Sequence, residues 1–234
     1  MVWGMALPGN FGDFWPDGNY VGWDEDLTAF FNNEMPADEK AQFDHISSYI
    51  YFVSQKLKTE PGRKPSPDYP PVGSVAAHEA PKRFKTTKSY SSLASFIELT
   101  SRIVAVDNSL KDLFERVEPG VHHFFPIEIE MPNNAVYPKQ FFVLVIGRYL
   151  DSFSPDQSNP DYLKPNGLRN YLVKRCGNQE AMSGLAFFKQ EFGGAHLWRE
   201  SCITNELFCL SDQLKSEITR LGLRLPKHYR MKEI

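Results

Sequence analysis

The sequence predicts an α+β protein in which helices pack against a mixed or antiparallel sheet and long proline-rich loops connect the elements. Three observations support this class. Apolar stretches of strand length recur along the chain, and the longest, Phe141 to Ile146, is far shorter than the roughly 18 residues of a membrane span. Two segments, Ile103–Ile129 and Leu207–Glu233, share a strand–helix–strand pattern. Prolines gather in two polar stretches, where they exclude regular structure.

The first 58 residues predict a strand, an irregular aromatic segment, a helix and a second strand. The opening residues are apolar, and Trp and Phe residues then alternate with Pro and Gly up to Tyr20. Acidic residues in the first turn of Asp24–Asn33 favour a short helix. Ile46–Val53 is rich in β-branched and aromatic residues, which is typical of a strand.

A long loop follows and marks the best internal boundary. Thr59–Pro81 carries six prolines among polar residues. We therefore expect an acidic, aromatic-rich N-terminal lobe over 1–81 and a C-terminal α+β domain over 82–234. The alternative is one continuous domain. Apolar residues spaced through Tyr90–Ser101 predict an amphipathic helix at the start of the second part.

The segment from Ile103 to Ile129 is the centre of the predicted fold. Its apolar strand ends at Asp107, which is suited to cap a helix, and the helix ends before a Pro-Gly turn. Gly120 is expected to take the positive φ of that turn. A second apolar strand then follows.

The remaining elements are predicted from shorter patterns. Gln140–Gly147 is a continuous apolar run and predicts a strand that is buried on both faces. Asp151–Pro165 is a polar loop with three prolines. Ser183–Lys189 is a candidate strand, and Gly193–Arg199 predicts a turn that leads into another.

The C-terminal segment repeats the central pattern. Val104–Lys111 aligns with Phe208–Lys215, and Ser211 stands where Asp107 caps the first helix. Internal duplication, two similar units around one sheet, and chance similarity all remain open as explanations.

Composition indicates a globular chain with a sizeable core, since 41% of its residues are hydrophobic and 14% aromatic. The three cysteines, an odd number with no close pair, predict reduced thiols in a cytoplasmic protein and no zinc site. No signal peptide is expected from the N-terminal sequence.

No motif for catalysis or cofactor binding stands out. The chain lacks a nucleophile elbow and a phosphate loop, so we expect no catalytic residues, no cofactor and no enzyme activity. His122 and His123 are adjacent on a strand and point to opposite faces, which argues against a metal site. Glu128 and Glu130 share one strand face, either as an acid pair or as its solvent side.

The central segment carries a family resemblance. Val117-Glu-Pro-Gly-Val-His-His-Phe-Phe-Pro-Ile-Glu-Ile129, preceded by Asn-Ser-Leu-Lys-Asp, resembles the signature of bacterial polymorphic-toxin immunity proteins. The family is the one numbered eleven among the immunity families, earlier catalogued as a domain of unknown function. Gly194-Ala-His-Leu-Trp-Arg199 and Phe208–Lys215 are also similar to it, so the resemblance spans Ile46 to Ile234. It implies a protein that binds and neutralises a cognate effector toxin.

The acidic N-terminal segment offers a physical link to such a role. Up to residue 50 there are nine acidic residues against a single base, Lys40, so this part carries −8 and the rest +5. An acidic face repels nucleic acid and attracts a basic protein, such as a nuclease with a phosphate-binding cleft. Aromatic residues among these acids resemble interface anchors. The expected toxin-binding residues are Asp13, Trp15, Asp17, Tyr20, Trp23, Asp24, Glu25 and Asp26.

The sequence therefore favours an immunity protein for a toxin of a type VI or related contact-dependent secretion system. One alternative is a hydrolase or transferase that uses Glu128, Glu130 or His123. Another is a non-catalytic adaptor of a secretion locus.

Overall fold

Two mixed sheets dominate the protein, which we describe from a computed structural model covering residues 1–58, 74–167, 170–205 and 207–234. The six-stranded sheet has the order β2 (Gly18–Tyr20), β3 (Arg83–Thr86), β6 (His123–Glu130), β7 (Phe141–Val145), β5 (Val104–Asp107) and β4 (Phe96–Glu98). The five-stranded sheet has the order β15 (His228–Arg230), β1 (Val2–Ala6), β14 (Leu207–Ser211), β13 (Leu197–Glu200) and β8 (Tyr149–Leu150). Only β3–β6 and β13–β8 pair in parallel within these two sheets. The predicted α+β class with a mixed sheet is confirmed.

Helices and two small sheets surround these strands. The helices are α1 (Trp23–Asn33), α2 (Ala37–Lys40), α3 (Ile46–Lys58), α4 (Asn108–Val117), α5 (Gln179–Ser183), α6 (Lys189–Phe192) and α7 (Asp212–Arg220). The small sheets pair β10 (Leu163–Pro165) with β11 (Tyr171–Val173), and β16 (Lys232–Glu233) with β12 (Ala186–Phe187) and β9 (Phe153–Ser154). Short 3₁₀ turns occupy Thr100–Arg102 and Pro160–Tyr162.

The two aligned segments form two units of the same topology. In the first, β5, α4 and β6 make a β-α-β crossover, and β7 lies between the two strands and antiparallel to both. In the second, β14, α7 and β15 do the same, and β1 is the intervening antiparallel strand. The strand that precedes each crossover, β4 or β13, pairs antiparallel at the outer side. We call these arrangements the first and second split units.

Local sequence explains why both units form. Asp107 and Ser211 each accept a hydrogen bond from the backbone N–H three residues on, at 3.0 Å, and so cap α4 and α7 as predicted. Gly120, in the turn after α4, has the predicted positive φ of 68°. The continuous apolar run of β7 is an interior strand of its sheet, as predicted from Gln140–Gly147.

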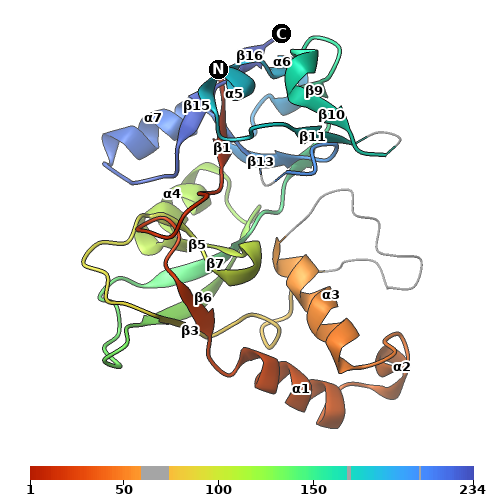
Figure 1. Cartoon of the computed structure of the whole chain (residues 1–234), viewed down its shortest axis with the longest axis vertical. Helices are drawn as coiled ribbons and strands as arrows, with labels where there is room; N and C mark the ends of the chain where they lie inside the picture. Colours follow the sequence, from red (N-terminus) through yellow and green to blue (C-terminus); the bar gives the residue numbers. More distant parts are fainter. Residues whose placement is uncertain (59–73, 168–169, 206) are drawn as a thin grey trace.

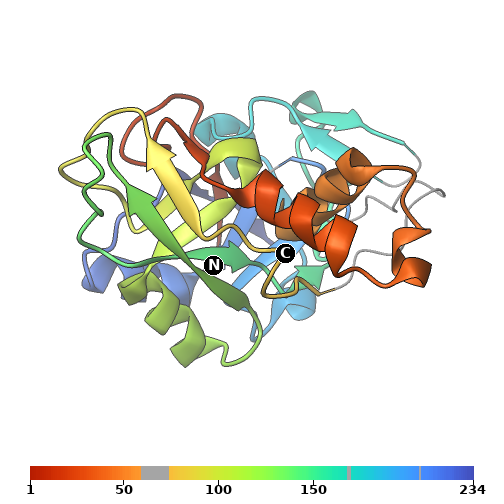
Figure 2. The same cartoon turned by 90° about the horizontal axis from the view of Figure 1, so that it is seen from below.

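Three hydrophobic cores separate the layers of sheets and helices. The middle core lies between the two sheets and takes Leu110 from α4, Leu214 from α7 and the facing rings of Phe96 and Phe208, 5.3 Å apart. A second core lies on the other face of the six-stranded sheet under α1 and α3. A third lies beyond the five-stranded sheet, beneath α5 and α6. Figure 1 shows α5 to α7 and both chain ends in the upper half and α1 to α3 in the lower half. In Figure 2, which views the molecule from below, α1 (red-orange) is in the foreground.

The predicted strand at Ile46–Val53 is wrong, because this segment lies within helix α3. Its buried residues include Tyr49, Phe52, Val53 and Leu57, a spacing of three to four that places them on one helical face. The β-branched and aromatic composition that suggested a strand reflects burial in the core beneath α3.

The predicted helix at Tyr90–Ser101 is also wrong. This segment contains β4 and a 3₁₀ turn, and Phe96 and Ile97 enter different cores on opposite faces of the sheet. Because each face of this strand contacts a core, adjacent residues are both apolar. The resulting pattern of apolar residues resembles that of an amphipathic helix.

The predicted loops and minor strands are confirmed in part. Of the loop Thr59–Pro81, residues 59–73 lie outside the described residues, and 74–81 are irregular with a turn at 77–79. The stretch Asp151–Pro165 contains β9 and β10. Only Ala186–Phe187 of the candidate strand Ser183–Lys189 is a strand, whereas β13 follows Gly193–Gly194 as expected.

Candidate partner-binding groove

A groove of about 700 Å³ lies where the start of α1 meets α3 and the Thr100–Arg102 turn. We call it the α1–α3 groove. Its floor and walls include Tyr20, Trp23, Asp24, Glu25, Tyr51 and Ser101. Four of these residues are among those that the sequence predicted for toxin binding.

The acidic rim of the groove comes from the first turn of α1. Gly22 begins this helix with a φ of 76°, and no side chain caps it. The negative charges of Asp24, Glu25 and Asp26 therefore compensate the free N–H groups of the first turn. Asp26 pairs with Lys82 at 3.2 Å, whereas no cationic side chain of the described residues is within ion-pair distance of Asp24 or Glu25. Both of these carboxylates are exposed to solvent.

The floor of the groove is rigid. The rings of Tyr20 and Trp23 meet edge to face at 4.9 Å. The Tyr20 hydroxyl donates to the Thr100 carbonyl at 2.9 Å, and Trp23 Nε1 donates to the Glu79 carbonyl at 2.8 Å. Burial, aided by the charge of Glu98, raises the pKa of Tyr20 well above its usual value. Trp23 is only 7% exposed, so it supports the surface more than it contacts a partner.

The walls of the groove carry an exposed ring and an unusual turn. Tyr51 on α3 is 46% exposed at the rim. Across the groove, Ser101 and Arg102 both have positive φ values, 65° and 63°. Two successive non-glycine residues in this region cost about 1 kcal/mol each or more. Arg102 pairs with the buried Glu98 at 3.0 Å, and Thr100 donates from its hydroxyl to the Gly18 carbonyl, so several contacts stabilise the turn.

The same turn links the groove to a second aromatic patch. The Arg102 guanidinium lies 5.5 Å from the centre of the Trp15 ring, and Phe11 packs on Trp15 at 4.5 Å. Phe11 is 56% exposed. Arg102 therefore lies between the groove and the Phe11–Trp15 pair, and Arg, Trp and Tyr are the side chains that most often anchor protein interfaces.

Two of the predicted residues, Asp13 and Asp17, do not line the groove. Asp13 pairs with Arg224 at 2.6 Å, and Asp17 accepts a hydrogen bond from the Thr87 hydroxyl at 2.7 Å. Both contacts tie the irregular N-terminal segment to later parts of the chain. Tyr51 was not predicted from the sequence, because its segment was predicted to be a strand. The exposed face of a helix could therefore not be assigned there.

Two buried carboxylates serve the structure. Glu118 accepts hydrogen bonds from the Leu197 backbone N–H at 2.8 Å and from His122 at 3.1 Å, and pairs with Arg148. Glu200 accepts from the Trp198 indole and from the Ser152 backbone N–H, each at 2.8 Å. The first contact joins the two split units, and the second holds the start of β9.

His122, just before β6, and the histidine and glutamates of β6 do not gather into a site. His122 is buried beside Glu118, whereas His123 and Glu128 are exposed, and Glu130 pairs with Arg83 at 3.5 Å. Within the described ranges, no three His, Cys, Asp or Glu side chains are placed to hold a metal ion. Nor does any helix among the described residues have the length and apolarity to cross a membrane.

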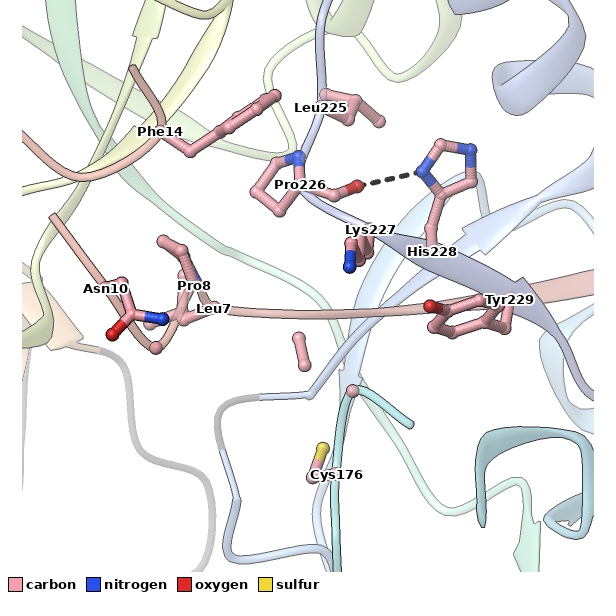
Figure 3. A pocket seen from close by; sticks show the side chains of 13 residues that line it. Leu7, Pro8, Asn10, Phe14, Cys176, Leu225, Pro226, Lys227, His228 and Tyr229 are labelled. Atoms are coloured by element: carbon pink, nitrogen blue, oxygen red, sulfur yellow. Dashed lines mark hydrogen bonds between the residues drawn. The ribbon is translucent and has the colours of Figure 1, made fainter. Parts of the chain in front are cut away.

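A second hollow, of about 590 Å³, lies at the junction of the two sheets. We call it the seam pocket. Its walls come from the segment after β1, from Cys176 and Gly177, and from Leu225 to Tyr229 (Figure 3).

The fold is an α+β protein built from two split units, with two hollows on its surface. A family model described as the Immunity protein family (Imm11) matches residues 29–231. The chain belongs to this family, which confirms the resemblance seen in its central segment. No curated protein matches it.

Membership assigns the protein its general role. Members of an immunity protein family neutralise a cognate toxin by binding it and are generally not catalysts. The match begins at residue 29, so all eight predicted toxin-binding residues lie outside it. Strand β1 also lies outside it, although it is an interior strand of the five-stranded sheet.

Proposed function

We propose that the protein neutralises a basic toxin, most simply a nuclease, by stoichiometric binding through the α1–α3 groove. The toxin belongs to a type VI or related contact-dependent system, and binding takes place in the cytoplasm. The observation that carries the proposal is the pair of carboxylates on Asp24 and Glu25, which have no ion-pair partner among the described residues. Nuclease clefts are basic because they hold phosphate, and such a surface is their electrostatic complement.

The aromatic side chains beside these acids support the same surface. Tyr51 and Phe11 are about half exposed, and Trp15 is partly exposed under Arg102. Burial of such rings supplies affinity, while the acidic rim mainly raises the association rate. The rigid Tyr20–Trp23 floor lowers the entropic cost of binding, because few side chains remain to be ordered.

The first experiment tests neutralisation itself. The protein is co-expressed with the toxin encoded by the neighbouring gene, and growth and co-purification are measured. We expect growth to be rescued and a stable complex to be recovered. Failure of rescue with a toxin that is active alone would contradict the proposed function.

The second experiment tests the surface. Reversing Asp24, Glu25 and Asp26 to Lys should lower the association rate about tenfold or more and weaken its dependence on salt. The matched control reverses Glu34, Asp38 and Glu39, exposed acids on and before α2, which changes the net charge equally. Association is followed by stopped-flow fluorescence. An equal effect of both triple variants would indicate steering by net charge alone and would place the interface elsewhere.

A further inference from the structure

The seam pocket has the size and chemistry of a small-molecule site. Its volume of about 590 Å³ falls within the range of roughly 300–1,000 Å³ that is usual for ligand pockets. Apolar walls come from Leu7, Pro8, Phe14 and Leu225. They belong to segments from opposite ends of the chain, so an occupant would contact both.

The polar groups of the pocket are few and point into it. Figure 3 shows the Lys227 ammonium and the Tyr229 hydroxyl directed into the hollow, with the Asn10 amide across from them. Among the described residues, none of these three side chains has a hydrogen-bond or ion-pair partner. His228 is already engaged, because its Nδ1–H donates to the Pro226 carbonyl at 2.9 Å.

Charge selects the kind of ligand. Among the described residues, no aspartate or glutamate lines the pocket, and Lys227 gives it a positive group. One ammonium with a hydroxyl and an amide suits a single carboxylate, whose oxygens accept several hydrogen bonds. One lysine matches the charge of a carboxylate more closely than that of a doubly charged phosphate.

We propose that the seam pocket binds a small monocarboxylate with an aromatic or branched alkyl body. The carboxylate accepts hydrogen bonds from Lys227, Tyr229 and Asn10, and the apolar body packs between Leu7 and Phe14. This site is separate from the α1–α3 groove and does not depend on toxin binding.

The probe is 4-phenylbutyrate, and the control ligand is the uncharged 4-phenylbutan-1-ol, which has the same apolar body. Isothermal titration should detect the acid and show binding of the alcohol at least tenfold weaker, since a hydrogen bond to a charged group contributes about 1.5–3 kcal/mol. Binding of neither ligand, or equal binding of both, would overturn the proposal.

Chemical modification of Cys176 can show whether the ligand occupies the seam pocket. This thiol is partly exposed in the pocket wall, whereas Cys209 is buried and burial raises the pKa of Cys202 to about 12. Thiolates are the reactive form, so iodoacetamide should modify Cys176 first. 4-Phenylbutyrate should slow the modification of Cys176, as measured by peptide mass spectrometry. An unchanged modification rate, despite binding detected by titration, would place the ligand elsewhere.

Variants complete the test. Lys227→Ala should weaken 4-phenylbutyrate binding severalfold, because Lys227 is exposed to solvent. Tyr229→Phe should also weaken binding severalfold with the ring packing retained. Lys232→Ala removes an exposed lysine outside the pocket and should leave binding unchanged. Equal effects of Lys227→Ala and Lys232→Ala would overturn the assignment.

Discussion

The two split units solve the same packing problem with strands from different places in the chain. In the first unit, the strand between β5 and β6 is β7, which follows β6 directly. In the second, the strand between β14 and β15 is β1, from the opposite end of the chain. Any apolar strand with the right alternation can occupy such a position, so the topology constrains pattern more than order.

The use of β1 as the intervening strand of the second unit has a structural consequence. Because β1 lies between β14 and β15, the N-terminal segment is part of the C-terminal sheet, and the Met1 ammonium pairs with Glu233 at 2.8 Å. We therefore propose that the chain folds as one continuous domain, in preference to separate parts over 1–81 and 82–234. Limited proteolysis that releases a folded fragment 82–234 would contradict this.

The largest expected losses of stability come from substitutions in the middle core, which the two units share. Leu110 and Leu214 occupy aligned positions, and each is fully buried in the middle core. Leu110→Ala and Leu214→Ala should each lower the free energy of unfolding by about 3 kcal/mol, because both leave a cavity. Urea unfolding measures this.

Leu221→Ala provides the control, since Leu221 follows α7 and is 42% exposed. Its effect should stay within about 0.5 kcal/mol. A large loss for only one of the two buried leucines would show that the units are not energetically equivalent.

The second prediction concerns the buried carboxylates, which differ between the units. Burial acts to raise the pKa of Glu118, but hydrogen bonds from His122 and the backbone around Leu197 outweigh it, so the pKa lies below its ordinary value. For Glu200, burial is the larger influence and raises the pKa despite bonds from Ser152 and Trp198. The two groups should therefore give stability opposite pH dependences.

The signs follow from linkage. Ionised Glu118 stabilises the fold above the pKa of the unfolded chain, and this contribution is lost as the pH falls through the lowered folded pKa. The contribution of Glu200 is complete below the unfolded pKa and is lost as the pH rises through the raised one. Glu118→Gln should thus lower the free energy of unfolding by about 2 kcal/mol at pH 7 and by less at pH 3. Glu200→Gln should lower it less at pH 7 than at pH 4. If the loss of stability varied with pH in the same way for both variants, the predicted contrast would be wrong.

Local signals allowed much of this architecture to be predicted. Caps and turns act within a few residues, so Asp107, Ser211 and Gly120 could be assigned from sequence. The strand partners could not, because the pairing of β1 with β14 joins residues about 200 positions apart. The binding residues predicted from sequence include only the groove residues near the start of α1. Tyr51 and Ser101 join them through the packing of α3 and the Thr100–Arg102 turn, which local sequence does not reveal.

The smallest effects test whether the caps of the two units are interchangeable. Asp107→Ala and Ser211→Ala should each cost about 1 kcal/mol, because the N–H of Leu110 or Leu214 loses its acceptor. Asp107→Ser and Ser211→Asp each retain an acceptor and should cost about half as much or less.

The surroundings of the two caps predict which exchange is better tolerated. Asp107 also lies 3.5 Å from the Lys139 ammonium, and a serine there gives up this contact. Lys139 is 56% exposed, so the loss should be small. Ser211 shares its hydroxyl with His196 at 2.8 Å, and an aspartate can accept from both partners. Thermal unfolding should therefore rank Ser211→Asp as the milder exchange. The opposite order would mean that the negative charge at Asp107 matters less than the hydroxyl at Ser211, and that the two helix starts are alike in geometry only.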